Sequence, residues 1–140
     1  MIDLTRIQDY IFSKIVKKFP QDVMTKYGMS SDNFTTNKVR NTEPTFPNVY
    51  VHITNSAEIG GETTGTMMCG ALVNFTIEVT DNDPDSLKSV HICREVTKIM
   101  KSLGFKANSL PITTNSLDST VTIAQFSRIY GDGDSYSYST

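Results

Sequence analysis

The segment Gly70–Phe105 constrains the fold of this chain more than any other, because a strand pattern runs directly into a helix pattern. Apolar and polar residues alternate from Val73 to Val79, which is the period of a strand with one buried face. The residues that follow form an apolar stripe at helical spacing, namely Ser89, Ile92, Cys93, Val96, Ile99, Met100 and Leu103. A strand and a helix of this kind can cover each other, so the segment predicts an α+β fold.

The expected ends of this helix follow from its flanking residues. Asp83 is the expected N-cap and Pro84 the first helical residue. Gly104 predicts the end of the helix in a Schellman motif, with Phe105 folding back on Met100. We therefore expect one helix from residue 84 to residue 103.

The other elements are expected on both sides of this segment. Leu4 to Phe19 has the apolar spacing of a helix, and residues 49–54 alternate as a strand. Further strands are expected at residues 105–113 and 120–130, with a weaker one at 34–40, whereas residues 21–48 otherwise read as irregular. The Gly- and Thr-rich residues 55–70 predict a long loop between the two central strands. The expected fold is a mixed or antiparallel sheet of about four to five strands with two helices packed on one face.

Length and composition narrow the class of protein. A chain of 140 residues suits a single domain, of which residues 131–140 are expected to form a flexible C-terminal tail. A formal net charge of −2 argues against general nucleic-acid binding. Two cysteines make no disulfide framework, and no apolar run is long enough to span a membrane, so we expect a reducing, cytosol-like compartment of synthesis.

The chemical motifs of the chain are incomplete. The glycines of Gly60–Thr66 are spaced as in a phosphate loop, but the Lys and Ser/Thr that contact phosphate and magnesium are missing. The acidic run at 81–85 begins like a calcium loop, yet Ser86 and Ile92 replace its Gly and Glu. We therefore expect no catalytic, metal or cofactor site. One alternative stays open, a small cytosolic enzyme or ligand-binding domain that uses His52, Cys69 and the glycine loop.

One apolar pair favours contacts with other proteins. Leu87 and Val90 lie one turn apart on the side of the second helix opposite its core stripe. Together with a polar outer strand face and a long projecting loop, this pair predicts subunit contacts.

Several patterns resemble the tail-terminator (tail-completion) proteins of long-tailed bacteriophages. The resemblance lies in FPNVYVHI at Phe46–Ile53, GALVNFTIEVTDND at Gly70–Asp83, the helix ending MKSLGF, and SRIYGDGD at Ser127–Asp134. Members of this family form hexameric rings that cap the tail tube, stop its polymerisation and join it to the head. The resemblance implies a structural virion protein rather than an enzyme.

The resemblance also implies partners and contact residues. The partners are further copies of the chain, the tail tube protein and a neck or head-completion protein, while DNA passes through the ring without specific binding. Assembly in the host cytoplasm is expected, without a membrane or a cofactor, and another neck or tail component is the alternative within the virion. Besides Leu87 and Val90, the implied contact residues are Ile59, Glu62, Thr64, Met67, Asp132, Asp134, Tyr136 and Tyr138.

Overall fold

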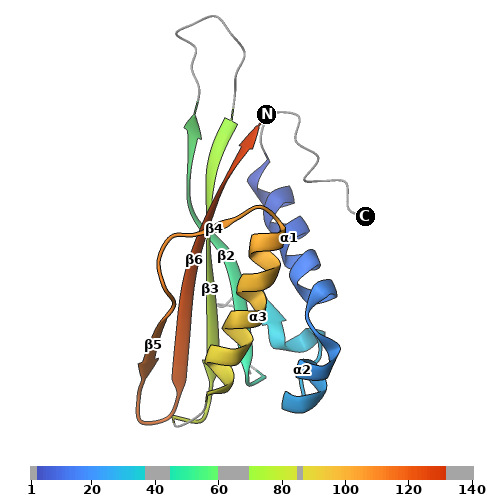
Figure 1. Ribbon diagram of the computed structural model, residues 1–140, viewed down its shortest axis with the longest axis vertical. Coiled ribbons are helices and arrows are strands. Elements are labelled where there is room, and N and C mark those ends of the chain that lie inside the picture. The colour runs from blue at the N-terminus through green and yellow to red at the C-terminus, as the bar shows by residue number, and fades with distance from the viewer. Residues whose placement is uncertain (1–2, 37–44, 60–69, 85–86, 132–140) are drawn as a thin grey trace, which may run out of the picture.

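The computed structural model describes residues 3–36, 45–59, 70–84 and 87–131 (Figure 1). The helices are α1 (Leu4–Lys18), α2 (Gln21–Tyr27) and α3 (Lys88–Ser102), with a 3-10 turn at Ser31–Asn33. The strands are β1 (Phe34–Thr35), β2 (Asn48–Ile59), β3 (Gly70–Asp81), β4 (Lys106–Ala107), β5 (Ile112–Asn115) and β6 (Thr120–Gly131). In the described part of the chain they form one sheet in the order β1-β2-β3-β6-β4, and β5 also pairs with β6.

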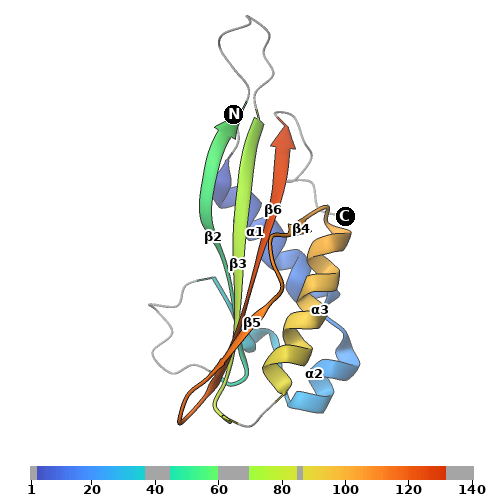
Figure 2. The same ribbon diagram turned by 60° about the vertical axis from the view of Figure 1, so that its left-hand side comes forward.

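The fold is α+β with a mixed sheet, as the sequence predicts. The pair β1–β2 is parallel, and the other strand pairs are antiparallel. Helices α1 and α3 both lie on one face of the sheet (Figure 2). This arrangement leaves two different surfaces, a helix layer and the opposite face of the long strands.

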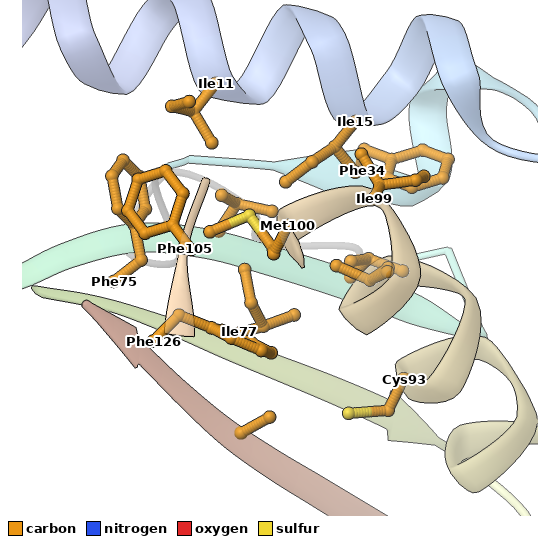
Figure 3. Packing of buried hydrophobic residues seen from close by; sticks show 14 of the residues in the cluster. Ile11, Ile15, Phe34, Phe75, Ile77, Cys93, Ile99, Met100, Phe105 and Phe126 are labelled. Atoms are coloured by element: carbon orange, nitrogen blue, oxygen red, sulfur yellow. The ribbon is translucent and has the colours of Figure 1, made fainter. Parts of the chain in front are cut away.

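The hydrophobic core lies between the sheet and these two helices (Figure 3). The alternation predicted for β3 is observed, since Val73, Phe75, Ile77 and Val79 are fully buried. Phe75 meets Phe105 edge to face, with ring centroids 5.4 Å apart. The apolar stripes of α1 and α3 are therefore buried against one face of the central strands.

The N-terminal helix forms where the sequence predicts it. The carboxylate of Asp3 accepts hydrogen bonds from the backbone N–H groups of Thr5 and Arg6, which makes it the N-cap of α1. The helix ends at Lys18, one residue earlier than expected, because Phe19 takes an extended conformation. Lys14 is buried rather than solvated, with its ammonium group over the ring of Tyr10.

The predicted start of the second long helix is wrong. Helix α3 begins at Lys88, and its N-cap residue is Leu87 rather than Asp83. The carbonyl of Asp83 accepts a hydrogen bond from the Thr120 hydroxyl, and that of Pro84 accepts one from the Asn115 side chain. These bonds to the β5–β6 hairpin hold the backbone after β3 in a turn, so the helix starts later.

The predicted end of this helix is confirmed. Gly104 has a φ of 92°, in the left-handed region, and its N–H donates to the Lys101 carbonyl. The N–H of Phe105 donates to the Met100 carbonyl at 3.0 Å. These two bonds define the Schellman motif, and Phe105 is buried as expected.

Residues 21–48 contain more structure than the sequence predicts. Helix α2 buries Val23 and Met24, a set too short to show a clear helical period, and it ends at Gly28 with a φ of 62°. Strand β1 begins at Phe34 as expected, but its described part has two residues. The described fold therefore has three helices rather than two.

Two strand boundaries also differ from expectation. Strands β2 and β3 pair as far as Ile59 and Gly70, so the connection between them is residues 60–69 and not 55–70. A register shift between Ile53 and Asn55 hides this continuation in the sequence, because it changes which residues face the core. The strand expected at residues 105–113 is divided into β4 and β5, with residues 108–111 between them.

Candidate interaction surface

The face of the sheet opposite the helices α1 and α3 is a surface that could meet a partner (Figure 2). We call it the outer sheet face and define it by the outward residues of the three long strands. On β2 these are Tyr50, His52, Asn55 and Ala57; on β3, Leu72, Asn74, Thr76, Glu78 and Thr80; on β6, Val121, Ile123, Gln125, Ser127 and Ile129. No helix of the described chain covers it.

The outer sheet face carries little charge. Glu78 is its one carboxylate, and no Lys or Arg occupies the outward positions of β2, β3 and β6 that are defined above. The exposed side of the helix layer differs, with the cations Arg6, Lys17, Lys18, Arg94, Lys98 and Lys101. Depletion of charged side chains is typical of the centre of a protein–protein interface.

A compact polar cluster lies at the centre of this face. The rings of Tyr50 and His52 stack with centroids 4.0 Å apart and planes 16° apart. The Nε2 of His52 lies 3.5 Å from the Glu78 Oε2, and the hydroxyl of Thr76 donates to the Thr54 hydroxyl at 3.0 Å. These contacts hold the side chains in place on neighbouring strands, so the surface is ordered before a partner arrives.

The positions of the two cysteines are relevant to the alternative hypothesis of an enzyme or ligand-binding domain that uses His52 and Cys69. Cys69 lies outside the described residues. Cys93 is on the helix side of the sheet and 1% exposed, and burial raises the pKa of its thiol to about 11, against a lowering by Thr97. A thiol of this kind is protonated at neutral pH and is not a nucleophile. Within the described ranges, no three His, Cys, Asp or Glu side chains are placed to hold a metal ion.

The expected contact residues fall into two groups. Leu87 is 78% exposed at the start of α3, whereas Val90 is half-buried, so the two do not form one exposed pair. Ile59 is the last residue of β2. The other seven lie outside the described residues, as do the loop and the tail that carry them: Glu62, Thr64, Met67, Asp132, Asp134, Tyr136 and Tyr138.

His91 has a partner that the sequence does not reveal. Its Nδ1 is 2.7 Å from the Tyr27 hydroxyl, and its Nε2 is 3.8 Å from the Glu95 carboxylate one turn along α3. His91 is half-buried, because Tyr27 of α2 packs against it. The arrangement joins α2 to α3 through a partly buried hydrogen bond.

Three strongly exposed aliphatic residues were not singled out in the sequence. Leu110, Ile112 and Leu117 are 86%, 65% and 94% exposed, on or beside β5. Ile112 pairs directly with Ile123 of the outer sheet face, so the apolar surface continues across the strand pair. The available signal was the segment from Ala107 to Leu117, which contains no charged residue.

No protein-family model matches the chain, and no curated protein is significantly similar to it. None of the helices in the described ranges is long and apolar enough to cross a membrane.

Proposed function

We propose that this chain is a structural subunit of a bacteriophage tail, which assembles into a ring at the head-proximal end of the tail tube. The ring, six-fold by resemblance, stops polymerisation of the tube and joins it to a neck or head-completion protein. The observation that carries the proposal is the outer sheet face, which is open, ordered and nearly without charge. The resemblance of Phe46–Ile53, Gly70–Asp83 and the end of α3 to tail-terminator proteins supports the same function.

The surface chemistry favours protein partners over nucleic acid. A nucleic-acid interface places Lys and Arg on the contact face, and the outer sheet face has neither on β2, β3 or β6. Its hydroxyl and amide side chains, with Tyr50 and the isoleucines Ile123 and Ile129, suit a broad contact with a neighbouring protein. DNA can pass beside such a surface without being held by it.

The experiment measures tube length in a purified system. Tail tube protein from the same phage is polymerised with and without this chain, and the tubes are measured by negative-stain electron microscopy. Shorter tubes with a ring at one end are expected. Tubes of unchanged length, without rings, would contradict the proposal and favour another neck or tail component.

Leu87 provides a matched test of the contact surface. Leu87→Glu places a charge on an aliphatic side chain that is 78% exposed, and we expect it to weaken capping. Ser13→Glu places the same charge on an exposed position of α1 and should cap normally. Equal capping by both variants would show that Leu87 is not part of the interface. It would not contradict the proposed ring.

A further inference from the structure

Strand β5 is an edge strand without a charged side chain. It pairs with β6 on one side, and no other strand of the described chain lies on its second side. All four residues, Ile112–Asn115, are exposed. Natural edge strands are guarded by short length, by proline, by charged side chains, by bulges or by a covering segment, because free backbone N–H and C=O groups recruit other strands. Strand β5 is short and follows Pro111, but it has no charged side chain. Here the residues from Ala107 to Leu117 carry no charge.

The chain covers part of the opposite edge of the sheet by itself. Strand β1 pairs with β2 at Val49 and Tyr50. Further along, the backbone N–H of Ile53 donates to the Gln8 side chain of α1 at 2.9 Å. The edge at β2 is therefore partly satisfied within one molecule, whereas the edge at β5 is open.

We propose that β5 pairs antiparallel with β5 of a second copy of this chain, across a two-fold axis, so that the two sheets become continuous. Residues opposite each other in an antiparallel pair project to the same face. Thr113 faces the helix side, where its hydroxyl is 3.0 Å from that of the buried Thr122, while Ile112 and Thr114 face outward. Among the two-fold registers that satisfy this rule, the one centred on Thr113 sets Thr113 opposite Thr113 and Ile112 opposite Thr114, and it keeps Ile112 within the paired stretch.

The second copy fits this edge because the edge is complementary to itself. A two-fold axis sets each charge near its own copy, and like charges opposite each other are unfavourable. The charge-free segment avoids that repulsion. Each copy also brings Ile112 and Ile123, which are direct neighbours across β5 and β6. The contact thus gathers four isoleucines on the outer face of the joined sheet.

This contact belongs to the free chain in solution. The contacts within a cyclic ring are heterologous, so a two-fold contact at β5 does not close one. The inference rests on the geometry of β5 and not on the proposed function, and either can fail without the other.

Cysteine cross-linking tests the register. With Cys69 replaced by Ser and the buried Cys93 kept, Thr113→Cys places two thiols opposite each other at the axis. Mild oxidation should convert most of this variant to a disulfide-linked dimer on a non-reducing gel. Leu117→Cys is the control, because Leu117 is 94% exposed but lies at the hairpin tip. Cross-linking of Thr113→Cys that is no faster than that of Leu117→Cys would overturn the proposed register.

Sedimentation equilibrium tests the edge without cysteine chemistry. The natural chain should dimerise, and Thr114→Lys should weaken the dimer by at least about ten-fold, because it sets two ammonium groups beside the axis. Leu117→Lys should leave the dimer unchanged, and circular dichroism checks that both variants are folded. A natural chain that stays monomeric, or a dimer that Thr114→Lys leaves intact, would refute the pairing.

Discussion

Helices α2 and α3 end in the same backbone motif, which allows one glycine to serve as the control for the other. At the end of α2, the N–H groups of Gly28 and Met29 donate to the carbonyls of Thr25 and Met24. Gly104 and Phe105 make the corresponding bonds at the end of α3. The two glycines differ in their surroundings, so their substitution by alanine should lower the free energy of unfolding by different amounts.

At Gly28, φ is 62° and a Cβ atom would meet nothing within 4 Å. Gly28→Ala should therefore cost only the left-handed backbone conformation, roughly 1 kcal/mol. At Gly104, φ is 92°, further from the left-handed minimum near 57°, and the strain is nearer the upper part of the roughly 1–3 kcal/mol range. A Cβ atom there would also lie 3.4 Å from the Arg128 Nε.

Arg128 cannot move away without loss. Its Nη1 donates to the Leu103 carbonyl at 3.0 Å, and its guanidinium group lies 4.3 Å from the centroid of the Tyr130 ring. Disturbing a hydrogen bond of this kind costs about 1 kcal/mol. We therefore expect Gly104→Ala to lower the free energy of unfolding by about 3 kcal/mol, against about 1 kcal/mol for Gly28→Ala.

Urea unfolding followed by circular dichroism measures both changes. A double-mutant cycle separates the two causes at Gly104, because Arg128→Ala removes the crowded side chain and leaves the backbone strain. In that background Gly104→Ala should cost about 1 kcal/mol less. The reasoning is refuted if the two alanine variants lose equal stability, or if the cost at Gly104 is the same with and without the Arg128 side chain.

Three further predictions follow from single contacts. Asp3→Ala removes the N-cap of α1 and should lower the free energy of unfolding by about 1 kcal/mol. Asp9→Ala within the same helix is the control and should lower it much less. Equal losses of unfolding free energy in the two variants would contradict the capping role. Tyr27→Phe removes the hydroxyl bonded to His91 and should lower the free energy of unfolding in urea by about 1 kcal/mol. An unchanged free energy of unfolding would show that the bond does not stabilise the fold. Because the pKa of Cys93 is raised to about 11, the folded state keeps its proton where the unfolded thiol has lost it, so stability should fall between about pH 9 and pH 11. Comparison with Cys93→Val isolates this part of the pH dependence, and identical slopes in the two proteins would exclude Cys93 as its source.

The candidate surface could be predicted only in part. The alternation in β3 correctly indicates one buried face and one open face. It does not show that His52, on another strand, lies 3.5 Å from Glu78, because this contact depends on the register between β2 and β3. The exposure of β5 was also not predicted, because an uncharged strand pattern has the same sequence whether it lies inside a sheet or at its edge.

The sequence by itself determined the elements whose signals are local. The helical period defines α1, the period-2 pattern defines β3, and Gly104 ends α3, because each depends on residues a few positions apart. The tertiary structure decided what depends on distant residues. Thr120 and Asn115 hold the carbonyls of Asp83 and Pro84 and delay the start of α3 to Lys88, against the capping signals of the local sequence. The same long-range pairing places β5 at the open edge of the sheet, since strand order depends on contacts between segments and not on the pattern within any one of them.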